Sequence, residues 1–138
     1  MSYLLWAILA LAAYTLVAPL VNVAMSEMPS EVVVFISNTI LVVGAAGVLL
    51  TSNHDVGSWL THQKAPYAYA AGLALAVGIL AYYRALSLGP VSVVVPIFGM
   101  FLVTSSLLGI VVLDEPLTAR KGLGLAFAVA AVYLTAVE

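Results

Sequence analysis

Five long apolar runs constrain the fold of this chain more than any other feature. An α-helix of about 20 apolar residues is long enough to cross the hydrocarbon core of a membrane. The runs do not alternate apolar and polar residues, as the strands of a membrane β-barrel would. We therefore predict an all-α membrane protein with five transmembrane helices. These cover about residues 3–23, 32–50, 65–86, 91–113 and 117–137.

The composition also favours lipid as the surrounding solvent. Of the 138 residues, 64% are hydrophobic and only 7% are charged, whereas a soluble domain carries about 25% charged residues. So short a chain cannot hide this much apolar side chain in a core, because surface outgrows volume in small proteins. All acidic residues fall at the ends of the runs or between them. The outer surface is therefore expected to face lipid.

The segments between the runs indicate one domain. No internal repeat and no low-complexity tail divides the sequence, so we predict a single five-helix transmembrane domain over residues 1–138. The first run follows no basic segment and precedes no cleavage motif of a signal peptide, so we expect it to be retained. The expected links are residues 26–31, 51–66, 87–90 and 113–118.

The basic residues predict the orientation in a cytoplasmic (inner) membrane. With five crossings, Lys64, Arg120 and Lys121 lie on the same side as the N-terminus, and Arg84 lies on the other. Since cytoplasmic loops are enriched in Lys and Arg, we expect the N-terminus in the cytoplasm. The charge difference is small enough for both orientations to coexist. Arg84 is expected to end a helix, where a cation complements the helix dipole; a role in gating or in attracting substrate is the alternative.

The sequence offers little for catalysis. It contains no cysteine. His54, Asp55 and His62 share one polar loop, and their spacing matches no common zinc signature. We therefore expect no enzyme, no metal site and no cofactor. The net charge of −2 and the scattered basic residues give no surface for nucleic acid.

Neutral polar groups inside the runs are the candidates for binding a small-molecule substrate. They share helix faces with small residues, and several helices carry such faces, so we expect them to line a hydrated cavity. Packing between helices is the alternative for any single residue, because small and polar residues also join membrane helices. The candidates are Tyr14, Asn22, Asn38, Tyr82, Ser92, Pro96 and Gly99.

Pro96 strengthens the expectation of a cavity. A proline inside a helix removes one backbone hydrogen bond and frees a carbonyl group. In lipid that carbonyl needs a partner, which a neighbouring helix or a cavity supplies. Transporters use such broken helices to form binding sites near the middle of the membrane. A simple kink is the alternative.

The last run carries small residues at helical spacing. Gly122, Ala126 and Ala130 recur every four residues, and Gly124 lies in a second row. Such rows allow close approach of two membrane helices. We expect this helix to pack against another subunit as well as within the chain.

The stretch "YYRALSLGPVSVVVPIFGMFLVTSSLLGIVVLDEPLTARKGLGLAFAVAAVYL" (82–134) resembles the second half of an EamA-type domain of the drug/metabolite transporter superfamily. Pro96 falls at a proline position of that pattern, and Asp114 replaces a common glycine. In the looser first half, Tyr14 replaces a frequent Trp and Asn22 a frequent Lys. The matching residues are Tyr82, Tyr83, Ala85, Leu86, Leu113, Glu115, Leu117, Thr118, Gly122 and Gly124.

The resemblance implies a transporter of small organic metabolites or drugs that works by alternating access. Members of the family usually have ten helices in two inverted five-helix repeats, with substrate between the repeats. This chain supplies one repeat, so the resemblance implies a homodimer, parallel or antiparallel, or a pair with another five-helix protein. The neutral Asn22 disfavours an anionic substrate, and the first run lacks the interior carboxylate that couples protons in small multidrug relatives. The alternatives are a component of a flippase for lipids or lipid-linked sugars, and a non-transporting assembly subunit.

Overall fold

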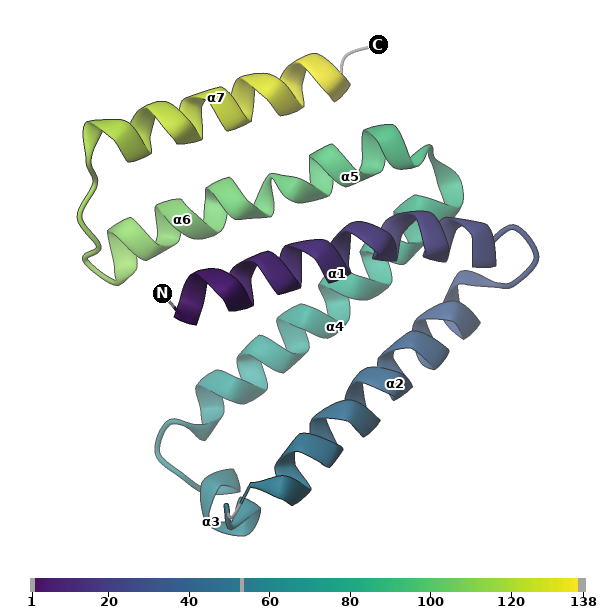
Figure 1. The fold of residues 1–138 in the computed structure, drawn as a ribbon, viewed down its shortest axis with the longest axis vertical. Coiled ribbons are helices and arrows are strands. Elements are labelled where there is room, and N and C mark those ends of the chain that lie inside the picture. The colour runs from purple at the N-terminus through teal and green to yellow at the C-terminus, as the bar shows by residue number, and fades with distance from the viewer. Residues whose placement is uncertain (1, 53, 137–138) are drawn as a thin grey trace. The chain divides into compact units, whose positions relative to one another are not determined.

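The computed structural model describes residues 2–52 and 54–136, and these residues form seven α-helices. In chain order, as Figure 1 labels them, they are α1 (Ser2–Ala24), α2 (Ser30–Thr51), α3 (Val56–Leu60), α4 (Ala65–Leu88), α5 (Val91–Gly99), α6 (Phe101–Val112) and α7 (Ala119–Ala136).

The predicted all-α membrane fold with five transmembrane helices is confirmed. Five helical stretches of the described residues are long and apolar enough to cross a membrane, and α5 and α6 together make the fourth. The spans differ from the predicted ones by no more than two residues at either end. They are Tyr3–Ala24, Ser30–Thr51, Ala65–Leu88, Val91–Val112 and Ala119–Ala136.

The chain forms two compact units, one up to Ser87 and one from Leu88 onward. In the first unit, the end of α1, the start of α2 and the end of α4 carry the buried side chains. Leu86 is only 1% exposed and Tyr83 only 3%. The other buried apolar residues of this unit are Ala18, Val21, Val33 and Val34. The core of the unit therefore lies at one end of its three long helices.

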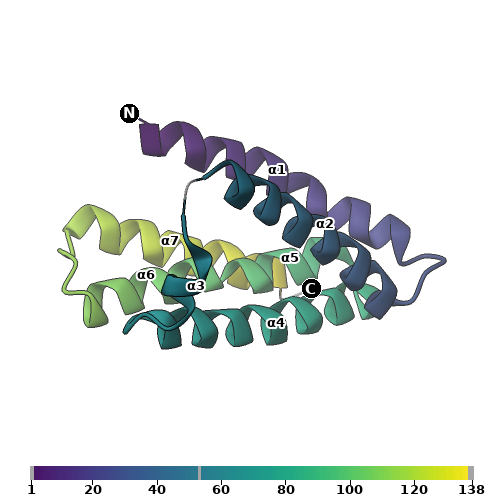
Figure 2. The same ribbon diagram turned by 90° about the horizontal axis from the view of Figure 1, so that it is seen from below.

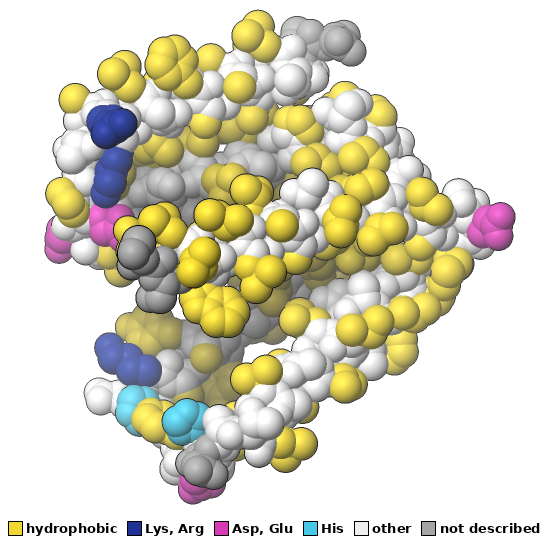
Figure 3. All heavy atoms as spheres, in the orientation of Figure 1, with side chains coloured by type: hydrophobic (Ala, Val, Ile, Leu, Met, Phe, Trp, Pro, Cys, Tyr) yellow, Lys and Arg dark blue, Asp and Glu magenta, His cyan; other side chains and the backbone are white. Residues whose placement is uncertain are grey.

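Away from this core, large apolar side chains lie on the surface, as the yellow atoms of Figure 3 show. Leu5 is 70% exposed and Leu50 is 88% exposed. Burying such side chains from water drives the folding of soluble proteins, so this surface would be unstable in water. A lipid environment removes that penalty, which agrees with a multi-pass membrane protein.

The link over residues 51–66 contains the short helix α3, which was not predicted from the sequence. Asp55 begins it as an N-cap residue, since its Oδ1 accepts a hydrogen bond of 3.1 Å from the Gly57 backbone N–H. Aspartate is a favoured residue at this position. The capping signal was present in the sequence, but a helix of this length contributes too little periodicity to be recognised.

In the second unit, the predicted fourth helix breaks at Met100. The Met100 N–H donates to the Ile97 carbonyl at 3.1 Å, three residues back, so the regular hydrogen bond to Pro96 is replaced. Pro96 has no N–H of its own to continue the ladder, and Gly99 is a poor helix former. The break therefore comes after Pro96 and Gly99, the two residues of α5 that fit a regular helix least well. α7 packs against α5 and runs beside it in both views (Figure 1, Figure 2).

The link between α6 and α7 has a demanding backbone. Asp114 has a φ angle of 53°, in the left-handed region that favours glycine. Thr118 caps α7, because its Oγ1 accepts a hydrogen bond of 3.2 Å from the Lys121 N–H. The fifth helix consequently begins at Ala119, two residues later than predicted.

The left-handed backbone at Asp114 predicts a difference between two substitutions. Asp114→Gly should leave the protein about 1 kcal/mol more stable than Asp114→Ala, because only alanine carries a Cβ that crowds this conformation. Thermal unfolding of both variants in the same detergent measures the difference. Equal midpoints would contradict the assigned backbone conformation.

Candidate functional site

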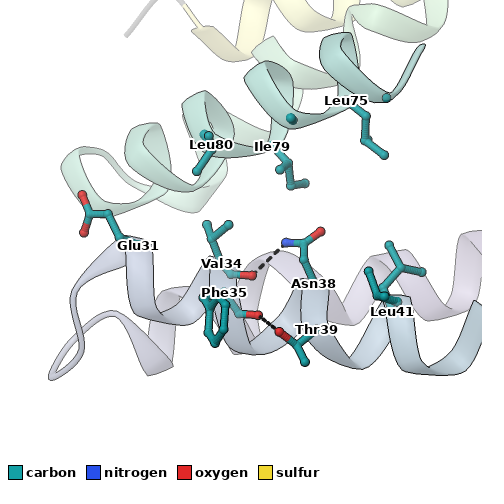
Figure 4. A pocket seen from close by; sticks show the side chains of 12 residues that line it. Glu31, Val34, Phe35, Asn38, Thr39, Leu41, Leu75, Ile79 and Leu80 are labelled. Atoms are coloured by element: carbon teal, nitrogen blue, oxygen red, sulfur yellow. Dashed lines mark hydrogen bonds between the residues drawn. The ribbon is translucent and has the colours of Figure 1, made fainter. Parts of the chain in front are cut away.

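A groove of about 590 Å³ lies between α2 and α4 in the first unit. Figure 4 shows Val34 and Asn38 of α2 directed towards Ile79 and Leu80 of α4 across it. On α2 it is lined by Glu31, Val34, Phe35, Asn38, Thr39, Leu41 and Val42, and on α4 by Gly72, Leu75, Ala76, Ile79 and Leu80. Most of this lining is apolar.

Small residues on α4 help to make the groove. Gly72 and Ala76 lie one turn apart and both line it. A Cβ added at Gly72 would meet no atom within 4 Å, so the space beside this glycine is open. Side chains of ordinary size at these two positions would reduce the groove.

Asn38 places a hydrogen-bonding group inside this apolar lining. Its Nδ2 donates to the Val34 carbonyl of the same helix at 2.9 Å. In Figure 4 the amide oxygen of Asn38 is directed away from that carbonyl. No described residue donates a hydrogen bond to this oxygen, so it is available to a ligand. The Thr39 hydroxyl is less free, because it donates to the Phe35 carbonyl at 2.7 Å.

Glu31 lies at one end of the groove and, of the described residues, is the only charged one that lines it. It belongs to the first turn of α2, where the helix dipole stabilises a negative charge. The groove thus combines one carboxylate at its end, one amide along its length and otherwise neutral groups.

A hydrogen bond between Ser37 and Tyr83 joins the two helices that form the groove. The Ser37 Oγ and the Tyr83 hydroxyl lie 3.0 Å apart. Ser37 also approaches the Val33 carbonyl at 2.8 Å. Since serine has only one hydroxyl proton, it donates to Val33, and Tyr83 donates to Ser37. Both groups are thereby satisfied at the buried end of the unit.

Asn22 joins α1 to α4 at the same end. Its Nδ2 donates to the Leu86 carbonyl at 3.2 Å, and its side chain is half-buried. We call the Ser37–Tyr83 and Asn22–Leu86 hydrogen bonds together the polar clasp. It holds the three long helices of the unit together where their apolar core lies.

The structure distributes the predicted substrate-binding residues over several places. Asn38 lines the groove and Asn22 belongs to the polar clasp. Tyr82 is half-buried, with its ring edge-on to Tyr83 at 6.2 Å. Tyr14 is 70% exposed on α1. Ser92, Pro96 and Gly99 belong to α5, in the second unit.

The prediction missed several residues that shape this site. Glu31 was assigned to a loop, and Ser37 and Tyr83 are partners 46 positions apart, which no local pattern could pair. Gly72 and Ala76 did carry a signal, since their spacing of four places two small residues on one helix face.

The predicted dimer-packing residues lie on α7. Gly124, Ala126 and Ala130 are exposed and Gly122 is half-buried. A Cβ at Gly122 or Gly124 would meet no atom within 4 Å. The space beside these glycines is therefore open, and pairing with another subunit there stays a prediction. Among the described residues no group of three or more His, Cys, Asp or Glu side chains could hold a metal ion.

Comparison with known proteins gives two matches. The family model of the EamA-like transporter family matches residues 1–137. A Sinorhizobium protein described as an "uncharacterized transporter in cobO 3′ region" is 28% identical over 141 residues, which covers 99% of this chain and 97% of that protein. No solved structure matches the chain.

The polar clasp predicts energetic coupling between two residues. Ser37→Ala and Tyr83→Phe should each destabilise the protein by roughly 0.6–2 kcal/mol, the range for hydrogen bonds between membrane helices. The double variant should cost less than the sum, because both changes remove the same bond. Unfolding in mixed micelles measures all three.

In a matched control, Thr39→Val takes the place of Ser37→Ala and is combined with Tyr83→Phe. The Thr39 hydroxyl bonds only within α2, so Thr39→Val and Tyr83→Phe should be additive. Additivity of Ser37→Ala and Tyr83→Phe as well would show that the Ser37–Tyr83 hydrogen bond contributes nothing to stability.

Proposed function

Because the chain belongs to the EamA-like transporter family, we propose that it carries small organic metabolites or drugs across the membrane. We propose further that two five-helix chains combine for this task, either two copies of this chain or one copy and another five-helix protein. The groove between α2 and α4 would then supply one wall of the substrate path, and the second chain the opposite wall.

The groove is the observation that carries this proposal. Its volume of about 590 Å³ falls within the range of about 300–1,000 Å³ for small-molecule sites. Mostly apolar lining with a few placed polar groups is also typical of such sites. Asn38 would accept a hydrogen bond from the substrate. Because the charged group that the described lining offers is the Glu31 carboxylate, a neutral or cationic substrate fits better than an anion.

The position of the polar clasp supports alternating access. Ser37, Tyr83 and Asn22 join the helices at one end of the first unit. At the other end, α2 and α4 are connected through the segment that contains α3. A pair of helices held at one end can change its separation at the other by a small rotation. If two chains faced each other through these helix pairs, the path would open to either side in turn, as in other transporters with repeated halves.

The apolar lining also favours a second candidate, a flippase component for lipids. Leu75, Leu80 and Val42 are the kind of surface that an acyl chain contacts. In this case the groove would be open to the bilayer, and the headgroup would bind near Glu31.

We propose that the chain lies in the cytoplasmic membrane with its N-terminus in the cytoplasm, from the distribution of its basic residues.

Transport by the purified protein tests the proposal. In liposomes, at least one solute from a panel of labelled amino acids, nucleosides and cationic drugs should enter faster than it enters empty liposomes. Asn38→Leu should reduce that rate roughly threefold to tenfold, because the substrate loses one hydrogen bond.

Thr15→Val provides the control for this variant. The Thr15 hydroxyl donates to the Leu11 carbonyl of its own helix at 2.7 Å, outside the groove. This variant should transport like the unaltered protein. If Asn38→Leu is equally active, the groove is not the path. If lipid probes move and the soluble panel does not, the flippase alternative replaces the leading proposal, and if neither moves, an assembly subunit does.

A further inference from the structure

A second pocket, of about 320 Å³, lies within the second unit where α6 and α7 are joined by residues 113–118. The transport proposal makes no use of it. Its deeper part is formed by the two helices, and its mouth by two residues of opposite charge. It is lined by Ser106, Ile110, Glu115, Lys121, Gly124 and Leu125.

The two charged residues share this pocket without pairing. Among the described residues no ion pair joins Glu115 to Lys121, although both line the same space. The Glu115 carboxylate lies over Gly109, since a Cβ built there would be 3.7 Å from each carboxylate oxygen. A neighbouring glycine leaves the carboxylate room but offers it no hydrogen-bond donor. Its oxygens are therefore available to a cationic donor.

Lys121 keeps most of its donors for a ligand. Its Nζ donates one hydrogen bond, to the Pro116 carbonyl at 3.1 Å. An ammonium group has three donors, so two remain. Lys121 also belongs to the first turn of α7, whose helix dipole favours an anion at this end. The mouth of the pocket thus offers a site for a negative group beside a site for a positive one.

The pocket continues from this charged mouth towards the hydrocarbon region. Ser106 lies six residues before Val112, the last residue of α6, which places it about 9 Å deeper along the helix axis. Ile110 and Leu125 supply apolar surface between the two levels. The span that contains α6 ends just before residues 113–118, and the span formed by α7 begins just after them. The mouth therefore lies at the membrane surface.

We propose that this pocket binds one bilayer phospholipid whose headgroup joins a phosphate to a primary ammonium, as phosphatidylethanolamine does. The ammonium donates hydrogen bonds to the Glu115 carboxylate, and the phosphate accepts from Lys121. The start of an acyl chain follows Ile110 and Leu125. Figure 3 shows basic and acidic side chains close together on the second unit.

The charge pattern selects this lipid among common phospholipids. Phosphatidylcholine carries the same phosphate, but its trimethylated ammonium has no N–H group to donate to Glu115. Phosphatidylglycerol has no cation at all, so Glu115 would repel it. Free phosphate or free ethanolamine would leave the apolar part of the pocket unused. The lipid is bound as a structural partner, and this inference does not depend on what the protein transports.

Lipid binding to the full-length protein tests the proposal. The detergent-purified protein is titrated with dioleoyl phosphatidylethanolamine, phosphatidylcholine or phosphatidylglycerol, and bound lipid is counted by native mass spectrometry. Phosphatidylethanolamine should bind about tenfold more tightly than phosphatidylcholine, as expected for one charge-assisted hydrogen-bonded pair. Equal affinity for the two lipids, or tighter binding of phosphatidylglycerol, would overturn the proposal. This comparison of lipids uses the unaltered protein, so its outcome does not depend on how any variant folds.

Four variants locate the site. Glu115→Gln should remove the preference for phosphatidylethanolamine, and Lys121→Gln should weaken both zwitterionic lipids while keeping their ratio. Asp114→Asn and Arg120→Gln are the matched controls, because they change neighbouring charges of the same sign that do not line the pocket. Both controls should bind like the unaltered protein. If Glu115→Gln keeps the preference, or if Asp114→Asn loses it, the assignment of the site is wrong.

Discussion

The absence of a hydrophobic force between helices in lipid governs this structure. Apolar side chains gain little by leaving lipid for a protein interior, so helix association depends on close packing and on hydrogen bonds. In the first unit those bonds are few. Tyr83 donates to Ser37, and Asn22 donates to the Leu86 carbonyl, all at one end of the long helices. This polar clasp lies where α1, α2 and α4 meet, and beyond it much of their apolar surface is exposed.

The same arrangement accounts for the groove. The clasp joins α2 and α4 at one end, and Gly72 and Ala76 place only small side chains on the groove side of α4. A volume of about 590 Å³ therefore stays open between the two helices. Asn38 contributes an amide to this surface, and Glu31 a carboxylate. One five-helix chain of the EamA-like transporter family thus presents a ligand-sized surface that is open on one side. A second chain that closes this side would complete a path through the membrane, which is why we propose a pair as the working form.

The sequence predicted the helices well, because each apolar run is long and lipid leaves a single chain few other ways to satisfy its backbone. For the site, it named single residues but not their partners. Asn38 lines the groove and Asn22 bonds to the Leu86 carbonyl of α4, and substrate binding at either stays a prediction. The partnership of Ser37 with Tyr83 spans two helices and leaves no trace in local spacing. At Asp114 the structure explains a difference noted in the sequence, since a φ of 53° favours the glycine that Asp114 replaces in the pattern that the chain resembles.

The access of water to the groove shows most directly whether α2 and α4 border a path through the membrane. The chain contains no cysteine, so a single introduced thiol reports on one position. Thr39→Cys lies in the groove, whereas Ile40→Cys is the next residue of α2, does not line the groove and is 68% exposed on the apolar surface. In proteoliposomes, a membrane-impermeant thiol reagent should label Thr39→Cys and leave Ile40→Cys unlabelled, and a transported solute should protect the first. Equal labelling of the two positions, or none at either, would contradict a hydrated path between α2 and α4.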